Sequence, residues 1–127
     1  MKKIGFITKN KVFAQSLSTQ IKNNPDLGFE PFLLHDPHQA ILDAEVLNID
    51  IAVVEMITGD QTDNEAVLSL CEGLRQVVPD CRLLLFVSQD DNASRKAAIK
   101  AMKRKIIDDF VFYDESLQYL LAKLGSL

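Results

Sequence analysis

The sequence predicts an α/β fold, a three-layer α/β/α sandwich of (βα)5 type with a parallel five-stranded sheet of order 2-1-3-4-5. Five short apolar runs alternate along the chain with longer stretches of helical periodicity. Most of these runs are apolar on both faces, which is typical of parallel strands buried between helices. The length of 127 residues suits one domain, 1–127, with a single sheet at its centre.

Each strand is expected from a short apolar run that is bounded by turn-forming or helical residues. The runs are 4–8, 29–34, 51–56, 82–87 and 110–113. Four to six residues are a common length for a strand and too few for a stable helix. The third run, "IAVVEM", departs from the pattern because it carries a carboxylate, Glu55, near its end.

The stretches between the strands repeat apolar residues every three or four positions, which predicts a helix after each strand. Phe13, Leu17 and Ile21 form such a stripe within 10–23, and a second stripe lies within 37–47. The other three stripes are Val67, Leu68, Cys71 and Leu74; Ala98, Ala101 and Met102; and Leu117, Leu120, Leu121 and Leu124. Right-handed crossovers then place helices on both faces of the sheet, in the flavodoxin-like arrangement.

In such a sheet the ligand crevice lies beyond the carboxyl ends of the strands, at the switch point between the first and third strands. The residues at those ends are Thr8, Lys9, Glu55, Ser88 and Tyr113. We expect these five side chains to form the rim of one pocket.

The whole chain resembles a receiver domain of bacterial response regulators. "IDIAVVEM" is similar to the third-strand segment of that family, with Asp50 at the acidic position that opens the strand and Glu55 at the phosphorylated aspartate. "IIDDFVFYDESLQYLL" (106–121) resembles the last strand and helix, with Asp108, Asp109 and Phe110 at the positions of an acidic pair and an aromatic residue. The resemblance implies a role in two-component signal transduction.

The phosphorylation machinery of that family is largely missing from this chain. Thr8 and Lys9 stand where two acidic residues usually hold magnesium, and Tyr113 stands where a lysine is usual. Only a hydroxyl after the fourth strand is retained, as Ser88. Because phosphoryl transfer needs charge neutralisation, normally by a metal ion on oxygen ligands, we expect no metal, no cofactor, no catalytic residue and no enzyme activity.

Three interpretations of Glu55 remain open. It is a phosphoacceptor in a genuine receiver, a partial mimic of phospho-aspartate with about one negative charge instead of nearly two, or a structural group paired with Lys9. The last two are compatible with each other. A small anion-sensing domain that binds its ligand near Lys9 is a further alternative.

Six of the fourteen basic residues lie between positions 95 and 105. A solvated helix face is the simplest interpretation, and a docking surface is the alternative. The resemblance favours docking, since the fourth helix, fifth strand and fifth helix form the usual output and dimer face of receivers. Lys100, Lys103 and Arg104 are therefore candidate partner residues, and Phe110 is a candidate switch residue.

Composition excludes several classes of protein. A net charge of −4 argues against nucleic-acid binding except through an attached domain, and no apolar run reaches the length of about 20 residues that a membrane helix needs. The chain has no glycine-rich nucleotide loop and no nucleophile elbow, so we expect a cytoplasmic interaction or dimerisation module. Cys71 and Cys81 are expected to be buried free thiols, and His35 and His38 to be solvated.

Overall fold

A computed structural model describes the chain except for residues 9–10, 35, 37, 57–60, 88–89 and 113–116 and the side chains of 61–63 and 117–118. Its elements, in chain order, are β1 (Lys2–Ile7), α1 (Lys11–Lys22), a 3₁₀ turn (Pro25–Leu27), β2 (Phe29–Leu34), α2 (Ala40–Leu47), β3 (Ile51–Met56), α3 (Gln61–Val77), β4 (Arg82–Val87), α4 (Asn92–Lys103), β5 (Asp109–Phe112) and α5 (Leu117–Ser126).

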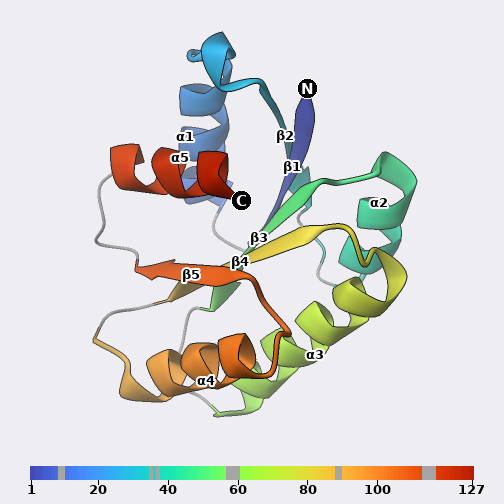
Figure 1. The fold of residues 1–127 in the computed structure, drawn as a ribbon, viewed down its shortest axis with the longest axis vertical. Coiled ribbons are helices and arrows are strands. Elements are labelled where there is room, and N and C mark those ends of the chain that lie inside the picture. Colours follow the sequence, from blue (N-terminus) through green and yellow to red (C-terminus); the bar gives the residue numbers. More distant parts are fainter. Residues whose placement is uncertain (9–10, 35, 37, 57–60, 88–89, 113–116) are drawn as a thin grey trace.

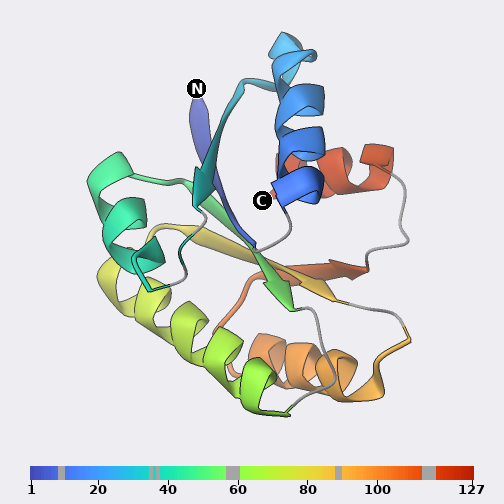
Figure 2. The same cartoon turned by 180° about the vertical axis from the view of Figure 1, so that it is seen from behind.

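The sheet has the predicted order, β2-β1-β3-β4-β5, and every pairing in it is parallel. Helices α1 and α5 cover one face, and α2, α3 and α4 cover the other (Figure 1 and Figure 2). The expected three-layer α/β/α sandwich is therefore confirmed.

Alternation along the strands divides the buried apolar residues into two cores. In β3, Ile51 and Val53 belong to the core beneath α1 and α5, whereas Ala52, Val54 and Met56 belong to the core beneath α2, α3 and α4. The helical stripes read from the sequence face these cores, as Leu17 of α1 and Leu74 of α3 illustrate. This sorting explains why the strands are apolar on both faces.

The first strand differs from its expected bounds of 4–8. It begins at Lys2, because the amide of Lys2 donates to the carbonyl oxygen of Gly28 at 2.9 Å and Lys2 pairs with Phe29 of β2. Gly28 ends the preceding 3₁₀ turn with a φ of 71°, a left-handed conformation that favours glycine. At its other end β1 stops at Ile7, so Thr8 directly follows the strand.

A carboxylate in the segment before β5, Asp108, joins that segment to the start of β4 and to the end of α3. Its Oδ2 accepts hydrogen bonds from the Arg75 guanidinium at 2.9 Å and from the Leu83 amide at 2.8 Å, and its Oδ1 accepts one from Arg82 at 3.3 Å. Burial works to raise the pKa of Asp108, but the hydrogen bonds and charges of these partners outweigh it and lower the pKa below its ordinary value.

Cys71 and Cys81 are buried free thiols, as expected. Burial raises the pKa of Cys71 to about 12 and that of Cys81 to about 11. Since the thiolate is the reactive form of cysteine, neither residue is a nucleophile near neutral pH.

Candidate functional site

The unusual carboxylate of β3 lies at the carboxyl end of the sheet. Glu55 follows Val54 and pairs in register with Phe86 of β4, so the alternation of the strand places it on the same face as Val53, beneath α1 and α5. Its side chain is only 7% exposed, and its Oε1 has no hydrogen-bond partner in the part of the chain that the structure describes. A buried carboxylate oxygen in this position calls for a donor or a positive charge.

Thr8 joins Glu55 at this end of the sheet. Ile7 pairs with Val54, and Thr8 and Glu55 are the next residues on the two neighbouring chains, with the same alternation and the same 7% exposure. The structure therefore brings together two of the five predicted rim residues, at the switch point between β1 and β3. The other three, Lys9, Ser88 and Tyr113, lie outside the described residues.

The donor set that the described residues provide at this point does not fit a magnesium ion. Magnesium prefers several oxygen ligands in near-octahedral geometry, supplied by one or two carboxylates together with waters or phosphate groups. Among the described residues, no group of three or more His, Cys, Asp or Glu side chains is arranged to hold a metal, and Glu55 has Thr8 as its neighbour on β1.

We expect magnesium to show no saturable binding in the low-millimolar range. Amide chemical shifts of the isotope-labelled protein, followed during a magnesium titration, check this. The Glu55→Gln variant is the matched control, and it should give the same weak, linear shifts. Saturation in the wild-type protein that is lost in Glu55→Gln would show that a metal site exists.

A polar cluster that the sequence interpretation missed links the first turns of α3 and α4. The hydroxyl of Ser94, which is fully buried, donates to Asp91 Oδ2 at 2.8 Å and lies 3.3 Å from Asn64 Oδ1 of α3. Asp91 also caps α4 by accepting from the amides of Ala93 and Ser94. The sequence "DNAS" (91–94) carried the signal of the cap, but nothing in it pointed to Asn64.

The basic residues of α4 do not form one uniform patch. Lys100, Lys103 and Arg104 are all exposed, but Lys100 and Arg104 line a groove whose opposite wall, on α3, carries Glu65 and Glu72. Lys100 and Lys103 also lie in the last turn, where positive charge is favourable to the helix dipole. The cluster thus has a local structural role besides any role in docking.

The candidate switch residue, Phe110, is half-buried on the α4 side of β5. Its ring packs edge-to-face on Phe112, with centroids 5.7 Å apart. Next to it, Asp109 accepts from Lys123 of α5 at 2.8 Å, and this hydrogen bond raises the pKa of Lys123. The ion pair therefore joins β5 to α5, while the aromatic contact lies within β5, on the side of the core beneath α4.

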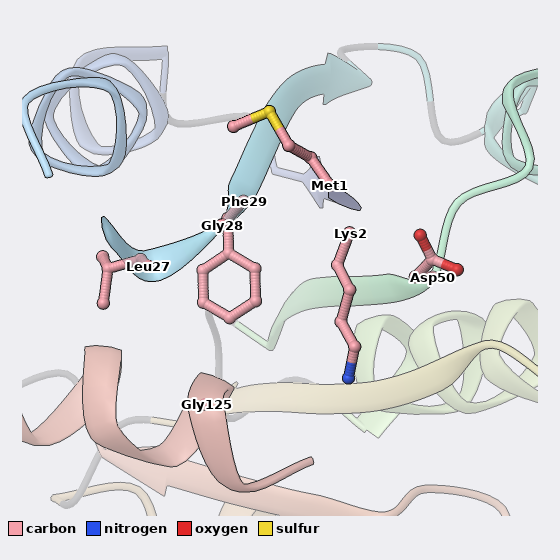
Figure 3. A pocket seen from close by; sticks show the side chains of 7 residues that line it. All are labelled: Met1, Lys2, Leu27, Gly28, Phe29, Asp50 and Gly125. Atoms are coloured by element: carbon pink, nitrogen blue, oxygen red, sulfur yellow. The ribbon is translucent and has the colours of Figure 1, made fainter. Parts of the chain in front are cut away.

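A hollow at the end of the sheet opposite to Glu55 has no part in the predicted site. It lies among Met1, Lys2, Phe29, Asp50 and Gly125, at the amino ends of the strands (Figure 3). Asp50 has a structural role there, because its Oδ2 accepts from the Lys3 amide at 2.8 Å. The acidic residue that opens the third strand is thus separated from Glu55 by the length of β3.

No protein family model and no curated protein matches the sequence. Solved structures match it over nearly its full length. A two-component response regulator from Clostridium difficile is 21% identical, with a TM-score of 0.78, and the match covers 99% of this chain and 94% of that one. A response regulator protein from Burkholderia pseudomallei, solved with a phosphorylated aspartic acid, calcium ion and citrate, is 23% identical, with a TM-score of 0.74 and coverage of 99% and 69%.

The chain therefore has the fold of response regulator receiver domains. The adenylate cyclase from Rhodopirellula baltica is also similar in structure, with 13% identity, a TM-score of 0.80 and coverage of 98% of this chain and 85% of that one. None of the described helices is long and apolar enough to cross a membrane.

Proposed function

We propose that the chain, residues 1–127, is a single receiver-like signalling domain that acts as a protein interaction or dimerisation module without conventional aspartate phosphorylation. The observation that carries this proposal is the environment of Glu55. A glutamate, buried beside Thr8, stands in our proposal at the strand position of the phosphoacceptor, and the donor groups of the described residues around it do not fit magnesium. In this account the domain is cytoplasmic and is not an enzyme.

The carboxylate of Glu55 is compensated, in our proposal, by Lys9. Burying an unpaired charge is costly, and Oε1 has no hydrogen-bond partner among the described residues. In the sequence Lys9 comes two positions after Ile7, whose strand neighbour is Val54, and this spacing is what suggests Lys9 as the partner of Glu55. An ion pair there would fill the space that a metal ion and a phosphoryl group need, and would leave Glu55 as a permanent, partial mimic of the phosphorylated state.

The interaction surface in this proposal is formed by α4, β5 and α5. The exposed basic residues of α4 lie at one edge of it, and the pair of Asp109 with Lys123 joins β5 to α5 within it. Phe110 lies on the α4 side of β5 within this surface. A change in the position of its ring would accompany a switch between two conformations of the domain. An acidic protein partner matches the charge of α4.

Charge reversal tests this surface. We expect the variant Lys100→Glu, Lys103→Glu, Arg104→Glu to bind a glutamate-rich helical peptide, used as a surrogate acidic partner, at least about tenfold more weakly than the wild type does. Fluorescence anisotropy at low and high salt measures the affinity. Surface charges usually change stability by less than about 0.5 kcal/mol each, so the fold should remain intact.

The matched control reverses Lys2, Lys11 and Lys22, which are three exposed lysines elsewhere on the chain. Peptide binding that depends equally on both sets of basic residues would show a non-specific charge effect. It would return the α4 cluster to the interpretation of a solvated helix face.

A further inference from the structure

Two helices, α2 and α4, carry exposed apolar residues. Those of α2 lie beside an acidic residue, and that of α4 lies beside basic residues. On α2, Leu42 is 59% exposed and Val46 is 71% exposed, one helical turn apart, with the exposed Glu45 beside them. We call these three residues the α2 face. Such a stripe on an eight-residue helix is unusual because the outer side of a helix on a sheet is normally polar.

The corresponding stripe on α4 is basic. Ile99 is 40% exposed and lies between Lys96, three residues before it, and Lys103, four residues after it, both of which are exposed. We call these three residues the α4 face. It lies outside the groove between α3 and α4, which Lys100 and Arg104 line.

We propose that the α2 face of one molecule binds the α4 face of a second copy of this chain. In this contact the side chains of Leu42 and Val46 cover Ile99, and the carboxylate of Glu45 lies between the ammonium groups of Lys96 and Lys103. Pairing like faces is disfavoured, because α4 against α4 would bring lysines together and α2 against α2 would bring glutamates together. This inference rests on the proposed function, since it names the partner of α4.

The arrangement of the helices makes this association directional. Helix α3 contacts both α2 and α4 and separates them, while β2 and β5 form the two edges of the sheet (Figure 1 and Figure 2). The two faces therefore lie at opposite ends of one helix layer. A contact between different faces is heterologous, so each bound copy presents a free face for the next one, and open chains or closed rings form.

The contact is small. Helix α2 is about 12 Å long, so the buried area is at the low end of that of transient complexes. We therefore expect weak association, visible as a rise in the sedimentation coefficient of the full chain between about 0.05 and about 1 mM.

Variants that each remove one face give the decisive test. Leu42→Gln with Val46→Gln removes the α2 face, and Ile99→Gln removes the α4 face, with a residue that suits an exposed helix. Each variant alone should remain monomeric in sedimentation velocity. An equal mixture should form dimers and nothing larger, because one intact face of each kind remains. The control is Val12→Gln, an exposed apolar position on α1 across the sheet, which should associate as the wild type does.

A charge swap tests the same contact without changing apolar surface. Glu45→Lys, or Lys96→Glu with Lys103→Glu, should weaken association about three- to tenfold, and combining all three changes in one chain should restore most of it. Wild-type protein that stays monomeric over the whole range, or a mixture of the face variants that stays monomeric, would overturn the inference. So would a loss of association in Ile99→Gln that Leu42→Gln with Val46→Gln does not share, because it indicates a symmetric contact between two α4 helices. The peptide-binding result is independent of these outcomes, so the proposed function can stand when this inference falls.

Discussion

Replacing Asp108 with alanine is expected to lower the free energy of unfolding by about 2–4 kcal/mol. The loss is large because one carboxylate serves three donors from different parts of the chain. The alanine variant leaves the Leu83 amide and the Arg75 guanidinium without their carboxylate partner where the segment before β5 joins α3 and β4. Urea unfolding followed by circular dichroism measures the change.

The dependence on pH separates this role from a packing effect. Since the pKa of Asp108 is lowered by folding, its ionised form stabilises the native state above the unfolded pKa of 3.8. The difference in stability between the wild type and Asp108→Asn should therefore be full near neutral pH and shrink as the pH falls through the folded pKa. Asp80→Ala, at an exposed turn, is the control and should change stability by less than about 0.5 kcal/mol. A difference that is constant down to pH 2 would contradict the assignment.

Breaking the proposed pair of Lys9 with Glu55 should reveal a coupling of about 1–3 kcal/mol, beyond the range of about 0–1 kcal/mol that is typical of exposed pairs. Glu55→Gln removes the charge of a buried side chain while nearly preserving its shape, so it would leave Lys9 without its counter-charge. Lys9→Met would leave the carboxylate unpaired. The double variant should recover much of the combined loss, because neither charge is then left alone.

The unfolding free energies of the wild type, both single variants and the double variant form the cycle that measures this coupling. A second cycle, with Lys11→Met and Glu55→Gln, is the control. Lys11 is an exposed residue at the start of α1, so the effects of these two changes should be additive. Additive effects of Lys9→Met and Glu55→Gln would reject the pairing and leave Glu55 as an uncompensated group.

Hydrophobic periodicity was sufficient to predict the five strands and five helices along the chain, and the flavodoxin-like arrangement supplied the order of the strands in the sheet. The reason is that the central strands are buried on both faces and each helix on one, so the core is visible in the pattern of apolar residues. The bounds of β1 were less predictable, because Lys2 and Lys3 join the strand through backbone hydrogen bonds and not through burial. Propensity and periodicity carry no record of such a pairing.

The candidate site was predictable in position and not in chemistry. The sequence indicated that Thr8 and Glu55 would meet at one end of the sheet, and the register of β1 with β3 brings them there. It did not indicate that Oε1 of Glu55 would be buried without a partner among the described residues, because the burial of a carboxylate depends on side chains from several elements. The bond from Ser94 toward Asn64 was hidden for the same reason, since the two residues are thirty positions apart.

The measurement that tests the central claim most directly is the intact mass of the full chain after incubation with a small-molecule phosphodonor, such as acetyl phosphate, and magnesium. A phosphorylatable response regulator in the same reaction serves as the control for the donor. We predict that this chain keeps its mass at every time point, because Thr8 and Lys9 stand where phosphoryl transfer needs metal-binding carboxylates next to the position of Glu55. A mass increase of one phosphoryl group that requires magnesium and disappears in Glu55→Gln would contradict the account and identify the chain as a phosphoreceiver.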